Sequence, residues 1–194
     1  MKKLKDIVQI QVGFTLARAK ASPSSLESYP YEIFSINAFP SDGIQMIHGY
    51  ENPYLSSEKI SETYLAQKGD VVIRLRDPIR SVYITESEKG LLVSSLAVIA
   101  RVDESQILGE YLAYYLNSKL AQSYFQAKVR GTAISMIRVA DLKEMSIPTP
   151  SLKRQKQIIA LMQEGDKQIS LLNELVEKKT AFKQQIFQTL ISKE

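Results

Sequence analysis

The C-terminal part of the sequence restricts the possible folds more than any other feature. From Ser151 to Lys193 the chain contains no proline and a single glycine, Gly165. Ser151 directly follows the run Pro148-Thr149-Pro150, and serine is a preferred N-cap residue. The pattern therefore predicts one long helix over residues 151–194, and a helix of this kind is about 60 Å long at about 1.5 Å per residue.

The predicted helix carries a stripe of apolar residues at spacings of three and four. A domain of about 150 residues has a radius of gyration near 15 Å, so it is too small to cover such a helix. We therefore expect a coiled coil with a partner helix. Lys179 falls within the stripe, and a polar residue in a seam fixes register or partner choice. The alternative is a helix that folds back and is broken at Gly165. The expected interface residues are Ile158, Leu161, Met162, Ile169, Leu172, Leu175, Phe182, Ile186 and Leu190.

Residues 1–150 have a different texture, which predicts an α+β domain. This part holds all 7 prolines and short β-branched or aromatic runs between turn residues. We predict strands over 32–36, 70–75, 81–85 and 91–100. A helix is predicted over 109–126 because apolar residues there recur at spacings of three and four. The residues of that expected buried face are Leu112, Tyr115, Leu116 and Leu120.

The composition excludes most catalytic chemistry. The chain has no cysteine, no tryptophan and one histidine, His48, which excludes disulfide scaffolds, zinc ribbons and thiol nucleophiles. No glycine-rich phosphate-binding motif is present. We therefore predict a protein that is not an enzyme and that holds no metal and no cofactor. The sequence has no signal peptide and no apolar stretch long enough for a membrane span, so we expect a cytoplasmic location.

The charge pattern favours a focused nucleic-acid interface. The net charge is only +4, but no acidic residue lies between Glu110 and Asp141. Three arginines also cluster around the predicted turn Asp77-Pro78. The guanidinium group of arginine can bind both guanine edges and phosphates. The alternative interpretation of the arginines is a strand face exposed to solvent. Ser94 and Ser95 lie in an apolar run, where the alternative interpretation is a simple bend. The candidate DNA-binding residues are Arg74, Arg76, Arg80, Ser94, Ser95, Lys128, Arg130 and Thr132.

Several motifs resemble those of the specificity subunits of type I restriction–modification systems. The run from Leu142 to Ile158 is similar to the pattern L-x-x-(I/M)-x-I-P-x-P-x-L-x-x-Q-x-x-I, with which a target recognition domain of that family enters a long helix. The opening Lys3-Leu4-Lys5-Asp6-Ile7 and Gly69-Asp70-Val71 also resemble family motifs, as do residues 111–118 and Gly131-Thr132. The resemblance covers the whole chain, although the tryptophan often found near the start of the family is missing.

The resemblance implies an architecture for the working assembly. Members usually carry two recognition domains and two long antiparallel helices, each domain reading half of a bipartite target. This chain has one of each, with a recognition domain at 1–150 and a helix at 151–194, as in a half-length subunit or a fragment. We therefore expect a homodimer with an intermolecular antiparallel coiled coil. A separator of about 60 Å spans a little under two turns of B-DNA, so the expected target is an inverted repeat with a non-specific spacer.

The resemblance also implies how the work is divided among subunits. In the family, a separate modification subunit transfers the methyl group of S-adenosylmethionine to adenine, and a restriction subunit cleaves the DNA. We therefore expect the cofactor on the modification subunit, which would contact the outer faces of residues 151–192. The alternative function is a non-catalytic dimeric coiled-coil adaptor whose α+β head binds protein. Steep loss of DNA affinity with salt would separate the DNA reader from this adaptor.

Overall fold

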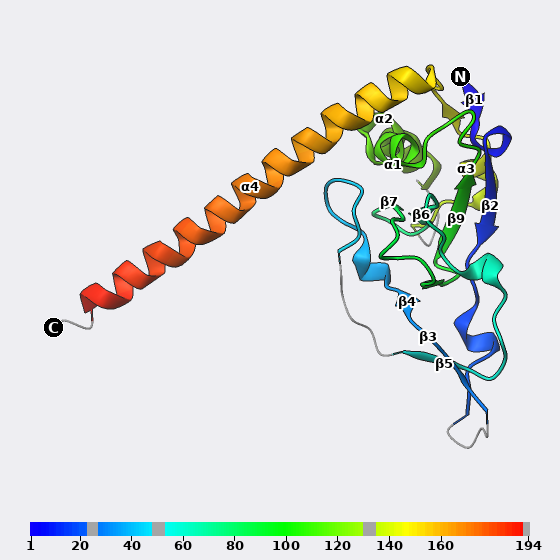
Figure 1. The fold of residues 1–194 in the computed structure, drawn as a ribbon, viewed down its shortest axis with the longest axis horizontal. Coiled ribbons are helices and arrows are strands. Elements are labelled where there is room, and N and C mark those ends of the chain that lie inside the picture. Colours follow the sequence, from blue (N-terminus) through cyan, green and yellow to red (C-terminus); the bar gives the residue numbers. More distant parts are fainter. Residues whose placement is uncertain (23–26, 48–52, 130–134, 192–194) are drawn as a thin grey trace. The chain divides into compact units, whose positions relative to one another are not determined.

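The computed structural model describes residues 1–22, 27–47, 53–129 and 135–191 and has a mixed α/β fold with a long C-terminal helix (Figure 1). The chain divides into two compact units, residues 1–156, here called the head, and residues 157–194. The strands are β1 (Lys2–Lys3), β2 (Val8–Val12), β3 (Tyr29–Tyr31), β4 (Ile33–Phe34), β5 (Tyr54–Ser56), β6 (Val71–Arg74), β7 (Ser81–Tyr83), β8 (Leu92–Val93), β9 (Ala97–Val102) and β10 (Ser146–Ile147). The α-helices are α1 (Gly109–Asn117), α2 (Lys119–Val129), α3 (Val139–Lys143) and α4 (Leu152–Ile191).

A four-stranded antiparallel sheet forms the centre of the head, with strand order β2-β9-β6-β7. Its two inner strands are rich in β-branched residues, which pack well on a pleated, buried surface. Val72 lies opposite Ile99 of β9 and Val82 of β7. The strands predicted over 70–75 and 81–85 are therefore confirmed, with slightly shorter bounds.

Both faces of this sheet are covered. On one face Val72, Val82 and Ile99 pack with the aromatic pair Phe34 and Phe39, whose ring centroids are 5.3 Å apart. On the other face α1 packs on β7 and β6, where the hydroxyl of Ser81 donates to the Ala113 carbonyl. The side chain of Asn117 accepts from the Ser81 backbone N–H and donates to the Ser81 carbonyl. Helix α1 is thereby fixed on the sheet.

Two predicted elements are interrupted in the structure. The expected strand over 91–100 is split into β8 and β9 by a turn at 94–96. The expected helix over 109–126 is split at Ser118, whose backbone is extended and whose hydroxyl accepts a hydrogen bond from the Ala121 N–H at the start of α2. Leu120 lies after this break, in α2, so it does not continue the buried face of α1 and is 75% exposed.

A short two-stranded ribbon joins the beginning of the head to its end. Strands β1 and β10 pair antiparallel, with Lys2 opposite Ile147, and the Leu4 N–H donates to the Met145 carbonyl. Helix α4 begins a few residues later, and the Ser151 hydroxyl accepts from the Arg154 N–H as a capping residue does. The predicted N-cap is therefore confirmed.

Gln155 holds the first turn of α4 against the head. Its side chain is fully buried, and its oxygen accepts from the Leu108 N–H at 2.9 Å. Its amide nitrogen donates to the carbonyls of Gln106 and Pro150. Since a buried amide is costly unless it is hydrogen-bonded, these contacts explain the glutamine of the helix-entry motif.

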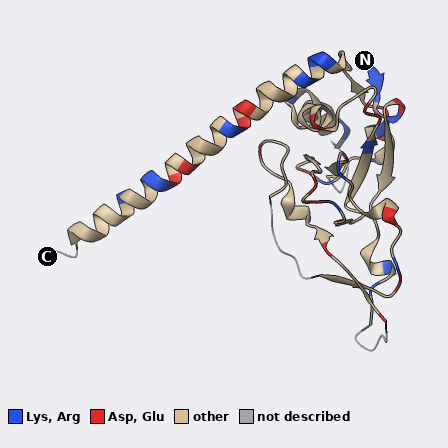
Figure 2. Cartoon of the chain, viewed as in Figure 1, with Lys and Arg blue, Asp and Glu red and all other residues tan. Residues whose placement is uncertain are grey.

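Helix α4 is 40 residues long and runs without a break through Gly165, so the alternative of a helix broken there is wrong. Its charges gather in bands separated by uncharged stretches (Figure 2). The large apolar residues that are exposed along it are Leu161, Met162, Ile169, Leu171, Leu172, Leu175, Val176, Phe182, Ile186, Phe187, Leu190 and Ile191.

Candidate nucleic-acid interface

Three segments of the head meet at one end of the central sheet. They are the loop at 74–80, here called the arginine loop, the turn at 94–96, here called the serine turn, and the segment 135–137. The register places Arg74 opposite Ala97, so β6 ends where β9 begins. The Leu75 N–H donates to the Leu96 carbonyl at 3.0 Å, which joins the arginine loop to the serine turn.

The arginine loop is a tight connection between β6 and β7. The Arg74 N–H donates to the Arg80 carbonyl at 2.8 Å and closes the loop, and the Asp77–Pro78 peptide bond within it is cis. Arg76 is exposed, while Arg74 and Arg80 are half-buried. The buried Leu75 separates Arg74 from Arg76, as alternation along an extended backbone requires. The predicted turn is confirmed, although β6 ends at Arg74 and Arg76 lies beyond the strand.

The serine turn brings hydroxyl groups to the same end of the sheet. Ser94 and Ser95 are half-buried, and the Ala97 N–H donates to the Ser94 carbonyl across the turn. The chain approaches Gly13 so closely that a Cβ atom there would lie 2.2 Å from the Ser94 carbonyl oxygen. The two serines therefore mark a bend, held by a glycine contact that no other residue would allow.

The segment 135–137 was not among the candidate residues, and it lies against the arginine loop. The Asp77 N–H donates to the Ser135 carbonyl at 2.8 Å, and the Ile137 N–H donates to the Leu75 carbonyl at 2.9 Å. Met136 forms an isolated bridge with Arg76 and is 40% exposed. Because the partners lie about 60 positions apart in the chain, no local sequence pattern marks this pairing.

This arrangement is suited to contacts with nucleic acid. Arginine guanidinium groups can make bidentate contacts with guanine or with phosphate, and serine hydroxyls can donate to phosphate oxygens. Exposed apolar side chains beside them, those of Met136 and Leu96, can contact a thymine methyl group. The end of the sheet thus combines groups for positioning the backbone with groups for reading bases.

Lys128 already has an acidic partner. Its ammonium group is 3.5 Å from a carboxylate oxygen of Asp141 and 5.7 Å from the ring centroid of Tyr124. Arg138 contacts the same carboxylate at 2.7 Å, and this hydrogen bond is the main reason that the pKa of Asp141 is lowered. The acid-free window in the sequence is therefore partly neutralised by the first acidic residue after it.

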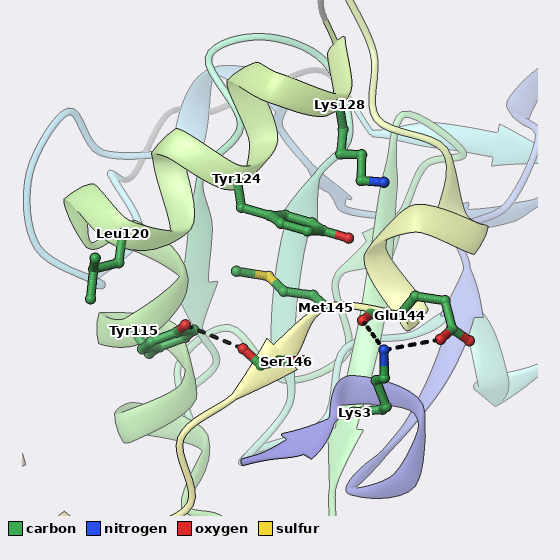
Figure 3. Close-up of a pocket in the computed structure, with 8 residues that line it drawn as sticks. All are labelled: Lys3, Tyr115, Leu120, Tyr124, Lys128, Glu144, Met145 and Ser146. Atoms are coloured by element: carbon green, nitrogen blue, oxygen red, sulfur yellow. Dashed lines mark hydrogen bonds and ion pairs between the residues drawn. The ribbon is translucent and has the colours of Figure 1, made fainter.

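Lys128 also lines a pocket of about 410 Å³ in the head (Figure 3). Figure 3 shows Met145 between the side chains of Tyr115 and Tyr124. The hydroxyl of Tyr124 donates to the Asp141 carbonyl and that of Tyr115 to the Ser146 carbonyl, so both rings are held by the chain that runs from α3 to β10. These contacts make the surroundings of Lys128 a structural part of the head.

Two of the candidate DNA-binding residues, Arg130 and Thr132, lie outside the described residues, and so does His48. Within the ranges that the structure describes, no group of three or more histidine, cysteine or acidic residues could hold a metal ion. Among the helices described, none combines the length and the apolarity that crossing a membrane requires.

Another charged pair has a structural setting, near the opposite end of β6. Asp70 is almost fully buried, and this burial raises its pKa, while the Gln67 N–H and the nearby Arg101 act in the other direction. Arg101 also donates to the carbonyls of Thr63 and Leu65. Arg101 is therefore occupied within the head, in contrast to the exposed Arg76.

Comparison with known proteins places these features in a family. A family model described as "Type I restriction modification DNA specificity domain" matches residues 1–179. The MjaVIII specificity subunit of a type I restriction enzyme from Methanocaldococcus jannaschii is 25% identical over 158 residues, which are 76% of this chain and 36% of that protein. The MjaIX specificity subunit from the same organism is 25% identical over 191 residues, 92% of this chain and 41% of that protein.

Solved structures with the same fold agree with this comparison. The HsdS subunit from Thermoanaerobacter tengcongensis matches with a TM-score of 0.58 and 21% identity, covering 88% of this chain and 38% of that one. The S subunit of a type I restriction–modification system from M. genitalium matches with a TM-score of 0.55 and 17% identity, covering 91% and 41%. The chain thus spans about two fifths of the length of these relatives.

Proposed function

The chain belongs to the type I restriction modification DNA specificity family, and from this membership we propose that it reads one half of a bipartite target in double-stranded DNA. The observation that carries the proposal is the meeting of the arginine loop, the serine turn and segment 135–137 at one end of the central sheet. Arg74, Arg76 and Arg80 are the base-reading candidates there, with Ser94 and Ser95 as positioning residues.

We assign a lesser, phosphate-contacting role to the basic stretch that begins at Lys128 and includes Arg130 and Thr132. Lys128 is 42% exposed at its side chain, so it can still approach a phosphate while it remains near Asp141. A cation that shares a carboxylate neutralises a phosphate less effectively than a free one does. The arginine loop, where Arg76 is exposed, is accordingly the centre of the proposed interface.

In this proposal the chain is a non-catalytic subunit, and the subunits that bind to it carry out the reactions. A modification subunit carrying S-adenosylmethionine would methylate adenine, and a restriction subunit would cleave the DNA. The outer faces of α4 would dock the modification subunit, since long exposed helices present wide surfaces for partners. The bound cofactor would supply the methyl group, while the residues of this chain would choose where it is placed.

The proposed working form is a homodimer whose two α4 helices pair antiparallel. Their exposed apolar stripes would be buried against each other, and an isologous contact would give two heads from one chain type. Two heads separated by a helix of about 60 Å would read half-sites a little under two turns of B-DNA apart. A twofold assembly would read an inverted repeat with a spacer that neither head contacts.

The decisive test is co-expression with a cognate modification subunit, followed by mapping of methylated adenines across a genome. A symmetric bipartite motif is the expected result, and methylation without any common motif would refute the proposal. Arg76→Ala should relax the motif at one position, whereas Lys59→Ala is a control on an exposed loop of the head.

Salt dependence provides a second test of the same proposal. Duplex affinity should fall by roughly 0.9 log units per log unit of salt concentration for each phosphate neutralised. Binding that does not respond to salt, or no binding to duplex DNA at all, would favour a dimeric adaptor whose head binds protein.

A further inference from the structure

Gly165 is placed where the structure of this chain gives no reason for a glycine. It lies inside the continuous helix α4, and it is not among the glycines with positive φ. A Cβ atom built on it would meet nothing within 4 Å. Glycine in a helix interior costs about 1 kcal/mol relative to alanine, so its absence of a side chain is destabilising for the chain taken alone.

The position of Phe182 is also unfavourable for a chain that stands alone. It continues the same stripe of α4 and is 63% exposed, although a phenylalanine gains most when it is fully buried. Facing layers of a packed seam are filled best when a large residue meets a small one. An unfilled glycine and an exposed phenylalanine on one stripe are therefore complementary.

We infer that Gly165 is the socket for Phe182 of a second copy, in an antiparallel pair with one defined register. The inference rests on the homodimer proposed above and deepens it. In this register Leu172 meets Leu175 of the second copy, and Leu161 meets Ile186. Each of these layers occurs twice, once on either side of the twofold axis.

The polar residues of the stripe select the same register. Gln168 and Lys179 are both exposed and fall in the seam, and in this register each meets the other across the interface. The glutamine oxygen can accept from the lysine ammonium group, which a polar layer in an apolar seam requires. A shift by one heptad in either direction instead places Lys179 opposite Leu161 or Leu175.

A parallel pair is disfavoured by the same residues. In a parallel register Lys179 would meet Lys179 of the second copy inside the seam, and two like charges there repel each other. Gly165 would then face Gly165, leaving a void, while Phe182 would face Phe182. The antiparallel register removes the void and the repulsion at the same time.

The apolar residues beside the seam extend the contact. Ile169 and Val176 are exposed on one flank of the stripe, and in the inferred register Ile169 of each copy lies near Val176 of the other. These residues broaden the buried face beyond a strict two-position seam, as in helices that pack in bundles. The centre of the pair falls between Asn173 and Glu174.

Crosslinking tests this register directly, because the chain contains no cysteine. A Gln168→Cys chain mixed with a Lys179→Cys chain should form disulfide-linked heterodimers on oxidation with copper phenanthroline. Neither variant should crosslink with itself, since the two copies of residue 168 would lie about 16 Å apart along the axis and a disulfide needs Cα atoms within about 7 Å. Self-crosslinking of the Gln168→Cys chain would overturn the register.

A size swap tests the socket. Gly165→Phe and Phe182→Gly should each raise the dimer dissociation constant at least roughly tenfold, because one overpacks the layer and the other empties it. The double variant restores one glycine and one phenylalanine to the layer, so its dissociation constant should return to within about threefold of the wild type.

The matched control for the swap is Gly165→Phe combined with Phe187→Gly, which has the same composition but removes a phenylalanine that faces away from the seam. It should remain as weak as Gly165→Phe alone when measured by sedimentation equilibrium. A swap no tighter than its single variants overturns the socket while leaving the dimer standing. A wild-type chain that is monomeric overturns both, and duplex DNA binding by the head is then measured separately.

Discussion

In the head, strands far apart in the sequence supply each other's hydrogen bonds, and the aromatic and β-branched residues are buried in the same chain. In α4, the backbone is satisfied within one helix, and large apolar side chains such as Leu172 and Phe182 stay exposed. The head therefore buries its apolar side chains within the same chain, whereas α4 satisfies only its backbone hydrogen bonds. A region of the second kind gains its stability from packing against another surface.

Removing the apolar stripe of α4 would break this comparison most severely. Leu172→Glu combined with Phe182→Glu should convert the dimer into a monomer, because charged groups would be buried in the seam. The thermal unfolding of the head should be unchanged, since neither side chain belongs to its core. Light scattering measures the mass, and an unchanged dimer mass would show that these residues do not form the seam.

The junction between head and helix is the next most sensitive point. Gln155→Leu should reduce the free energy of unfolding of the head by about 1–3 kcal/mol, because the Leu108 N–H loses its buried partner. Urea denaturation provides the measurement. Lys156→Ala, at the exposed neighbouring position, is the matched control, and equal losses in the two variants would argue against a role for the buried amide.

Within the head, two kinds of cation should behave differently. Arg76→Ala should cost about 1–3 kcal/mol of binding at one base position and relax the target there. Lys128→Ala should weaken the binding of all DNA sequences evenly and by a smaller amount, because the Lys128 ammonium group already contacts Asp141. Competition binding with single-base variants of the target distinguishes these outcomes. Full discrimination by the Arg76→Ala variant would remove the arginine loop from base reading.

The smallest expected effect concerns the acid side of the stability profile. The pKa of Asp141 is lowered, first by its hydrogen bond with Arg138, so its ionised form stabilises the folded head above about pH 4. That contribution is lost as the pH falls through the lowered pKa. Asp141→Asn should therefore show a shallower fall of Tm as the pH is lowered below about 4. Arg138→Gln should act in the same direction, and a steeper fall in either variant would contradict the assignment.

Much of the fold could be predicted from local patterns, and the failures have physical causes. The long helix and its Ser151 cap followed from the proline-free stripe, and β6 and β7 followed from β-branched runs. The break at Ser118 was missed because it contains neither glycine nor proline, whereas a bend at Ser94 and Ser95 had been given only as an alternative to a DNA-facing role. The pairing of β1 with β10 depends on contacts across almost the whole head, which no local window contains.

The candidate site was predictable only in part, for a similar reason. The arginine loop could be recognised from residue types and a turn, and the structure brings it to the serine turn. The partnership of Lys128 with Asp141 could not be read from a count of charges, because it depends on how α2 and α3 meet. The pairing of Met136 with Arg76 likewise needs the folded chain.

The ribbon of β1 and β10 brings the first and last strands of the head side by side. These two strands are hydrogen-bonded neighbours. The residues between them could therefore be exchanged while the connection to α4 stays the same. Gln155 could make the same contacts with a head of different sequence, because its hydrogen bonds are with the main chain of Gln106, Leu108 and Pro150 and not with their side chains.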